Sequence, residues 1–237
     1  MANPGVQSQP PASHQNFAII VAGGSGTRMG SNVPKQFLLL AGKPVMMYTI
    51  EAFYHSETNP QIIAVLPDDY HAYWEELCVV HEFNIPHLLV NGGATRFESV
   101  KSGLATIEGS EYDLVAVHDA VRPLTKTGLI DSSFRHAAAH GNAVAAVKSR
   151  DTVRQMRNGV TSHLLRDEIY LVQTPQTFQL AQLKSAYRHP YSDRFTDDAS
   201  VVESAGFSIE LIEGSHENIK ITFPGDLKIA ELLLQFS

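Results

Sequence analysis

Hydrophobic and polar positions alternate with two different periods along the first two thirds of the chain. Patterns with helical spacing cover residues 44–55, 68–82, 96–107 and 128–140. Between them, short apolar runs predict buried strands at Phe17–Val21, Gln61–Leu66, His87–Val90, Leu114–His118 and Ala143–Val147. Strands that alternate with helices favour right-handed βαβ units. We therefore expect a Rossmann-like α/β fold, a mainly parallel twisted sheet with helices on both faces and ligands beyond the carboxyl ends of the strands.

The alternation stops at about residues 149–170, which are mostly polar. Asn158-Gly159 strongly favours a two-residue type I′ turn, and a turn there pairs Val153 with Leu164. An isolated hairpin with so little apolar surface is marginal in water. We therefore expect a protruding β-hairpin arm that packs against a second subunit, which gives a homodimer.

The rest of the chain returns to alternation. It predicts a helix near Leu180–Arg188, a helix that begins at a Thr196 cap, strands at Ile209–Glu213 and Asn218–Ile221, and a last helix with Pro224 in its first turn. We expect one domain over residues 17–237. Residues 1–16 carry no charge and are rich in Pro, Gln and Ser, which is typical of a flexible tail.

Charge and cysteine content narrow the function classes. A net charge of −7 over 237 residues argues against general binding to nucleic acid or to a membrane surface, since neither attracts an acidic chain. Phosphates must therefore be bound by local groups of cations. Cys78 is the only cysteine, which excludes an intramolecular disulfide and a thiolate zinc cluster. The sequence shows neither a signal-peptide pattern nor an apolar run near the about 20 residues that span a bilayer, and we expect a cytoplasmic protein.

A glycine-rich loop, AGGSGTRMG at residues 22–30, follows the first apolar run. Glycines let backbone N–H groups approach an anion closely. Arg28 and Lys35 supply the charge that several phosphates require. The dinucleotide fingerprint is excluded because Gly30 comes one position late, and the P-loop is excluded because no Gly-Lys-Ser/Thr triplet occurs. The loop predicts a polyphosphate site.

Five further blocks occur in a fixed order. They read GGATRFESV at 92–100, HDAVRP at 118–123, QTPQ at 173–176, TDDAS at 196–200 and NIKIT at 218–222. With the glycine loop, they resemble the 2-C-methyl-D-erythritol 4-phosphate cytidylyltransferases of the non-mevalonate isoprenoid pathway, from about Phe17 to the C-terminus. The resemblance implies transfer of CMP from CTP to the acceptor, 2-C-methyl-D-erythritol 4-phosphate, with release of pyrophosphate.

The resemblance also implies the residues of the site. Charge on the nucleotide's phosphates would be stabilised by Arg28 and Lys35, and the attacking phosphate would be positioned by Lys220 and by Arg166 of a neighbouring subunit's arm. Nucleotide contacts would come from Ala22, Gly23, Gly24, Gly26, Gly93, Ser99 and Ala120. Acceptor contacts would come from Asp119, Arg122, Thr152, Arg166, Thr174 and Lys220. Mg²⁺ is expected to bind mainly through CTP phosphates, with no metal ligand from the protein.

Alternatives remain open at this point. A relative in the same superfamily makes CDP-ribitol from ribitol 5-phosphate and shares several blocks, although residues 196–200 resemble the methylerythritol enzymes more closely. Ala94 departs from the acidic residue of many relatives. A non-catalytic nucleotide-binding protein would lack Arg28, Lys35 or Lys220, and all three are present. His136 and His140 lie four apart on a predicted helix, but Ala137 stands where a zincin requires glutamate, so no metal site is expected there.

Overall fold

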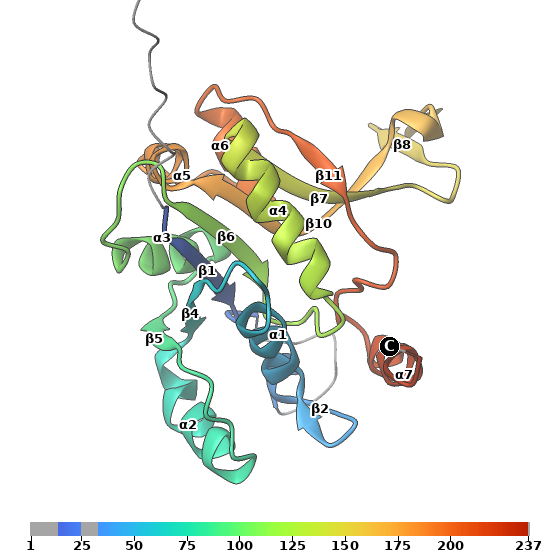
Figure 1. The fold of residues 1–237 in the computed structure, drawn as a ribbon. Coiled ribbons are helices and arrows are strands. Elements are labelled where there is room, and N and C mark those ends of the chain that lie inside the picture. Colours follow the sequence, from blue (N-terminus) through green and yellow to red (C-terminus); the bar gives the residue numbers. More distant parts are fainter. Residues whose placement is uncertain (1–13, 25–32, 237) are drawn as a thin grey trace, which may run out of the picture.

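A seven-stranded sheet forms the centre of the protein in the computed structural model, which describes residues 14–24 and 33–236 (Figure 1). In sheet order, the strands are β11 (Leu211–Glu213), β7 (Asn142–Lys148), β10 (Tyr170–Gln179), β6 (Leu114–Asp119), β1 (Asn16–Val21), β4 (Gln61–Leu66) and β5 (Leu88–Asn91). Strand β10 is antiparallel to both neighbours, and every other pairing is parallel. The mainly parallel α/β sheet is confirmed.

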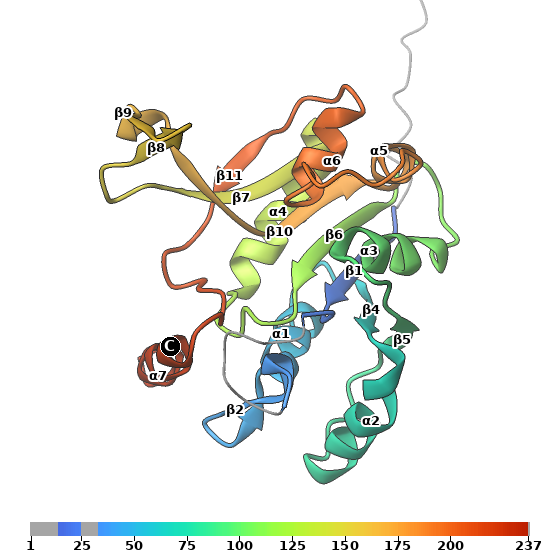
Figure 2. The same ribbon diagram turned by 180° about the vertical axis from the view of Figure 1, so that it is seen from behind.

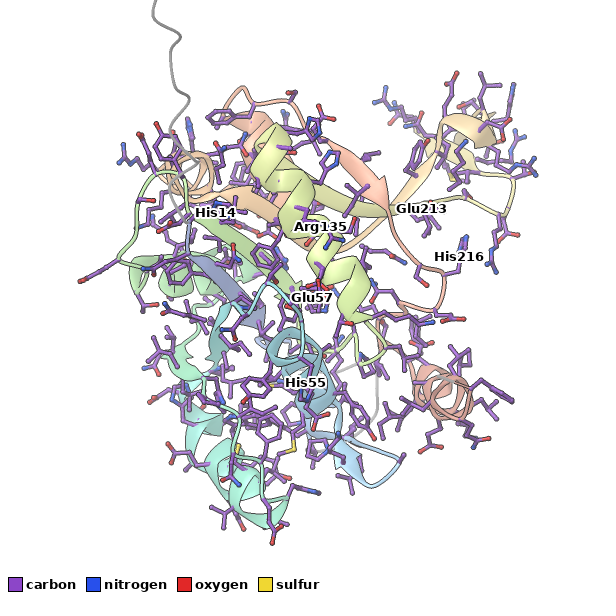
Figure 3. The ribbon with its side chains drawn as sticks, in the orientation of Figure 1. His14, His55, Glu57, Arg135, Glu213 and His216 are labelled. Atoms are coloured by element: carbon purple, nitrogen blue, oxygen red, sulfur yellow. The ribbon has the colours of Figure 1, made fainter. Side chains whose placement is uncertain are left out.

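Helices cover both faces because side chains alternate along the strands. One face packs against α1 (Val45–Tyr54), α2 (His71–Val80) and α4 (Thr127–His140). The opposite face, turned to the viewer in Figure 2, packs against α3 (Arg96–Ala105), α5 (Leu180–Ala186) and α6 (Asp198–Ser204). In Figure 3, the labelled His55 and Glu57, which follow α1, lie on the same side of the sheet as Arg135 of α4.

A third apolar cluster lies beyond the end of β6. Helix α7 (Pro224–Leu234) begins with the expected proline and packs against the segment that follows β6. The short hairpin of β2 (Leu39–Leu40) and β3 (Lys43–Pro44), preceded by the 3₁₀ turn η2 (Lys35–Phe37), packs there too. This cluster supports the segments that surround the carboxyl ends of β1 and β6.

The arm is a two-stranded hairpin that projects from the sheet (Figures 1 and 2). Strands β8 (Arg154–Arg157) and β9 (Val160–His163) pair around Asn158 and Gly159, whose φ angles are 49° and 78°. The N–H of Leu164 donates to the carbonyl of Val153 at 3.0 Å. The turn and the register expected from the sequence are confirmed.

Strand β10 was not expected, because the polar block QTPQ interrupts its apolar pattern. The polar side chains of residues 173–177 are buried and have tertiary partners: Gln176 Nε2 donates to Asp197 Oδ2 at 2.9 Å, and Thr177 Oγ1 donates to Ser133 Oγ at 2.9 Å. A buried polar group is tolerated when it is hydrogen-bonded. Central strands can therefore be polar where the fold supplies such partners.

Two C-terminal expectations are corrected. Residues 218–221 form an irregular segment rather than a strand, because the N–H of Ile221 donates to the carbonyl of Val121 at 2.9 Å instead of joining the sheet. Helix α6 begins at Asp198, and its cap is Asp197 rather than Thr196, since the Asp197 carboxylate accepts from the N–H of Ser200 at 2.9 Å. The tail expected at 1–16 lies outside the described residues up to position 13.

Candidate functional site

A cavity of about 250 Å³ opens at the carboxyl ends of β1 and β6, where ligands of such sheets bind. It gathers residues from the glycine loop, from η2, from the loop before α3, from the end of β6 and from the segment before α7. The lining residues are Val21, Ala22, Gly23, Gly24, Lys35, Gln36, Gly93, Ala94, Thr95, Arg96, Ser99, Asp119, Val121 and Lys220. Many residues from the separate sequence blocks thus share one cavity.

The loop before α3 forms one wall and is held by its own hydrogen bonds. The N–H of Gly93 donates to Ser99 Oγ at 3.1 Å, and that hydroxyl donates to the carbonyl of Thr95 at 3.0 Å. Thr95 and Glu98 form a capping box. An added Cβ at Gly93 would overlap Glu98, so only glycine fits there. Ser99 therefore shapes this wall from within.

Lys35 reaches the cavity from η2 and is buried. Its Nζ donates to the carbonyl of Ile221 at 3.0 Å. An added Cβ at Gly24 would lie 3.5 Å from Lys35 Cε, so the lysine stem runs directly beside the glycine loop. The ammonium group thus lies between the glycine loop and the segment that carries Lys220.

Asp119 ends β6 and carries a carboxylate surrounded by cations. Its Oδ2 lies 3.1 Å from Lys220 Nζ and 3.1 Å from Arg122 Nε, and its Oδ1 lies 3.8 Å from Arg96 Nε. Burial alone would raise the pKa of this carboxyl. The charges of Lys220, Arg96 and Arg122 outweigh burial and hold the pKa well below its usual range, so Asp119 is ionised.

A second cavity of about 290 Å³ adjoins the first, and the two share Arg96, Asp119 and Lys220. Its remaining wall comes from β10 and from the segment before α6. The additional lining residues are Arg122, Val172, Gln173, Thr174, Gln176, Thr196 and Asp197. Asp119 and its cations therefore stand at the junction of two polar hollows.

Hydrogen bonds fix the backbone around this junction. The N–H of Asp119 donates to Thr174 Oγ1 at 3.1 Å. Arg122 Nη1 donates to the carbonyl of Asn218 at 2.7 Å, and Asn218 Nδ2 donates to the carbonyl of Thr174 at 2.8 Å. These bonds link the end of β6 to β10 and to the segment that carries Lys220. Arg122 and Thr174 hold Asp119 as well as lining the second cavity.

Arg96 and Asp198 were not among the expected site residues, although both stand in the blocks GGATRFESV and TDDAS. Arg96 lines both cavities and donates to both oxygens of the buried Asp198. Burial would lower the pKa of Arg96, but the carboxylates of Asp198 and Asp119 raise it. The sequence signal that could have indicated Arg96 is its position at the start of a capped helix, directly after Thr95.

Some expected residues do not line either cavity. Ala120 is fully buried, its N–H donates to the carbonyl of Val21, and its carbonyl accepts from Thr49 Oγ1. Thr152 and Arg166 lie on the exposed arm and line neither cavity. Gly26 and Arg28 lie outside the described residues.

The histidines do not form a metal site in the described part of the chain, where no group of three or more His, Cys, Asp or Glu side chains could hold a metal ion. His136 and His140 lie with ring centroids 4.2 Å apart. His118, next to Asp119, is fully buried, and burial lowers its pKa to about 3. His118 is therefore a neutral core residue at physiological pH.

The family model of 2-C-methyl-D-erythritol 4-phosphate cytidylyltransferase matches residues 17–236. The chain belongs to this family. A relative of that name from Phocaeicola vulgatus is 47% identical over 216 residues, which are 91% of this chain and 98% of the relative. One from Azobacteroides pseudotrichonymphae is 48% identical over 221 residues, covering 93% and 99%. As a family member, the chain is a nucleotidyltransferase.

Solved structures of this family have the same fold. The 4-diphosphocytidyl-2C-methyl-D-erythritol synthase of Anaerococcus prevotii aligns with a TM-score of 0.80 at 27% identity, over 94% of this chain and 96% of that one. The Francisella tularensis cytidylyltransferase aligns with a TM-score of 0.76 at 32% identity, over 92% and 99%. These relatives favour the methylerythritol enzyme over the ribitol alternative. None of the helices in the described ranges is long and apolar enough to cross a membrane.

Proposed function

We propose that this chain transfers CMP from CTP to 2-C-methyl-D-erythritol 4-phosphate and releases pyrophosphate, with each substrate in one of the two adjoining cavities. The single observation that carries this assignment is the ionised Asp119, ringed by cations at the junction of the cavities. A cytidylyltransfer site must hold two anionic substrates with their reacting groups in contact. Two adjoining hollows that share Arg96, Asp119 and Lys220 meet that need.

The first cavity is assigned to the nucleotide. Its walls are backbone at Ala22, Gly23, Gly24 and Gly93, which suits close approach of a base and of phosphates. Lys35 borders this cavity and is assigned, with Arg28 of the glycine loop, to the charge that develops on the α-phosphate and the departing pyrophosphate.

The second cavity is assigned to the acceptor. Asp119 accepts hydrogen bonds from acceptor hydroxyl groups in this proposal, and Lys220 positions the acceptor phosphate for attack. A phosphate monoester has a second pKa of about 6, so its attacking oxygen is already ionised near neutral pH. The chain therefore needs no general base. Its task is to reduce the repulsion between two polyanions and to align them.

Mg²⁺ is proposed to arrive with CTP, held through phosphate oxygens and water. The chemistry of the site fits this arrangement, because the Asp119 carboxylate is engaged by three cations. Bound Mg²⁺ would neutralise charge on the phosphates. The chain's own residues contribute hydrogen bonds and fixed positive charge around the same phosphates.

The arm is proposed to complete the site of a partner subunit in a homodimer. Arg166 has 56% of its side chain exposed, and the arm also exposes Met156, Val160 and Leu165. Exposed apolar side chains on a protruding hairpin are typical of an interaction surface. Arg166 and Thr152 would then reach the acceptor of the neighbouring chain. We propose the cytoplasm as the compartment.

A pyrophosphate-release assay tests the function. The folded protein with Mg²⁺ and CTP is given 2-C-methyl-D-erythritol 4-phosphate, ribitol 5-phosphate or no acceptor. We expect release with the first acceptor and little with the others. Release with ribitol 5-phosphate alone would overturn the assigned acceptor. Failure to release pyrophosphate with any acceptor would overturn the proposed transfer.

A further inference from the structure

Asp198 is a buried carboxylate to which the proposed transfer gives no task. Its side chain is fully buried at the first position of α6. Arg96 Nη1 donates to Oδ1 at 2.9 Å, Arg96 Nη2 donates to Oδ2 at 2.6 Å, and the Tyr187 hydroxyl donates to Oδ1 at 2.6 Å. A buried carboxylate is tolerated only when it is paired in this way. The same bonds constrain their donors.

The pair with Asp198 sets the direction of the Arg96 side chain. Two parallel N–H···O bonds fix the plane of a guanidinium group. Each terminal nitrogen of Arg96 donates one N–H to Asp198, and its Nε lies 3.8 Å from Asp119 Oδ1. Arg96 therefore lies between the two carboxylates, at the junction of the cavities.

Aromatic packing holds Tyr187 in place, and hydrogen bonds to β10 hold the first turn of α6. The ring of Tyr187 stacks on Phe97 with centroids 4.6 Å apart and an interplanar angle of 20°. The N–H of Ala199 donates to Gln176 Oε1 at 2.8 Å, and Gln176 Nε2 donates to the Asp197 cap. The first turn of α6 is thus tied to α3, to the residue after α5 and to the central strand β10.

The backbone of the loop before α3, which forms one wall of the nucleotide cavity, is held independently of the Asp198 pair. The loop before α3 is held by the Gly93–Ser99 hydrogen bond and by the capping box of Thr95 and Glu98. Loss of the Asp198 pair would free the Arg96 side chain while these bonds remain. Arg96 also lines the nucleotide cavity, so we expect a small effect on CTP binding and the larger effect on Asp119 and the acceptor.

We propose that Asp198 and Tyr187 clamp Arg96 and thereby position the Asp119 carboxylate for the acceptor, which makes Arg96 and Asp198 positioning residues. The inference rests on the proposed function, which assigns Asp119 to the acceptor. Among the described residues, Lys220 and Arg122 pair with Oδ2 and Arg96 pairs with Oδ1. Without Arg96 held at Oδ1, the Asp119 carboxylate is free to turn toward Lys220 and Arg122.

The test compares two buried carboxylates. Asp198→Asn keeps the shape of the side chain and removes its charge, and Asp113→Asn is the matched control. Asp113 is also buried and accepts from the N–H groups of Gln15 and Ser110 and from the Ser110 hydroxyl, and it lines neither cavity. Each variant is measured for Tm, for the Kd of CTP and for acceptor kcat/KM.

Asp198→Asn should lower acceptor kcat/KM on the order of tenfold or more, because small misplacement of a contacting group is costly. The Kd of CTP should change less than about twofold. Asp113→Asn should lower Tm without an acceptor-specific loss. Equal acceptor losses in both variants, or an unchanged acceptor kcat/KM in Asp198→Asn, would overturn the clamp.

A double-mutant cycle with Asp119→Asn adds the decisive comparison. If Asp198 acts through Asp119, then Asp198→Asn should cost little further acceptor kcat/KM once Asp119 is changed. Fully multiplicative losses would overturn the inference. Arg96→Lys, which keeps the charge but cannot bridge two oxygens, should resemble Asp198→Asn.

If Asp198→Asn does not fold, Tyr187→Phe decides, since it removes a single hydroxyl donor. It should give a smaller loss that is again confined to the acceptor, and no loss would overturn the clamp. Wild-type protein that releases no pyrophosphate with any acceptor would instead refute the proposed function. The two failures are therefore distinguishable.

Discussion

The Asp119 cluster and the arm both carry residues proposed to contact the acceptor, but they are built differently. In the cluster, Asp119, Arg122 and Thr174 are buried and bonded to one another or to Asn218. In the arm, Thr152 and Arg166 are exposed, and Arg166 Nε lies 3.7 Å from Oδ1 of the neighbouring Asp167. One chain is thus sufficient to orient the cluster. In the proposed homodimer, the arm's side chains would be oriented by the partner subunit.

The largest effect is expected from removing the charge of Lys35, which lines the nucleotide cavity beside the Asp119 cluster. Lys35→Ala should lower kcat on the order of 10²–10³, because a charge that matters mainly as pyrophosphate departs stabilises the transition state more than the ground state. Steady-state kinetics measures kcat, and calorimetry measures the affinity for CTP. Lys43→Ala is the control, since Lys43 pairs with Glu51 and does not line the cavity. An unchanged kcat with a raised KM for CTP would reduce Lys35 to a binding residue.

The corresponding change in the arm should be smaller and of another kind. Arg166→Lys keeps the charge but loses the planar fork, and it should raise the acceptor KM on the order of tenfold with CTP affinity nearly intact. Arg157→Lys changes an exposed arginine of the same arm and should leave both constants unaltered. An equal rise of the acceptor KM in the two variants would show that the effect is not specific to Arg166.

Mixing subunits sharpens the comparison, because it asks whether the two cavities of one chain and the arm of the other chain form the same site. Lys35→Ala protein mixed with Arg166→Ala protein should recover about a quarter of wild-type activity. Half of the dimers are mixed, and each of these has one intact site out of two if the arm crosses over. Absence of recovery, with subunit exchange demonstrated by mass spectrometry, would show that Arg166 serves its own chain or no site.

The smallest effect concerns pH and the buried histidine. His118 has a folded pKa of about 3, below the value of about 6.5 in an unfolded chain, so only the unfolded state takes up its proton between those values. Stability should therefore fall as pH drops below about 6.5, by about 1.4 kcal/mol between pH 7.5 and 5.5.

Urea unfolding at a series of pH values measures this slope. His118→Gln should flatten it whatever its effect on stability at neutral pH. His163→Gln, at an exposed position of the arm, is the control and should leave the slope in place. An unaltered slope in His118→Gln would show that other groups govern the acid response.

Periodicity and turn chemistry predicted most of the fold. The strands β1, β4, β6 and β7 follow apolar runs, and the arm follows the Asn158-Gly159 turn. Strand β10 could not be found in this way, because Gln176 and Thr177 are buried through partners distant in the sequence. Apolar patterns in a sequence indicate strands that are buried among hydrophobic side chains. They do not indicate strands whose buried polar side chains are hydrogen-bonded.

The site was predictable to a similar extent. The sequence blocks indicated Lys35, Asp119 and Lys220, and these line one cavity. Their mutual distances were not predictable, since they depend on how β6, η2 and the irregular segment at 218–221 meet. Arg96 escaped notice because its charge is paired with Asp198, far along the chain, and only the fold joins the two.

The place of β10 in the sheet has a consequence for the newly made chain. Strands β5, β4, β1 and β6 come from residues up to Asp119 and can pair as soon as these are available. Strand β7 is synthesised next, yet it joins the sheet through β10, which emerges only after the whole arm. Until then, β6 and β7 both present unpaired edges. We expect aggregation during synthesis to be most acute in this interval, and we expect it to lessen when β10 fills the gap between β6 and β7.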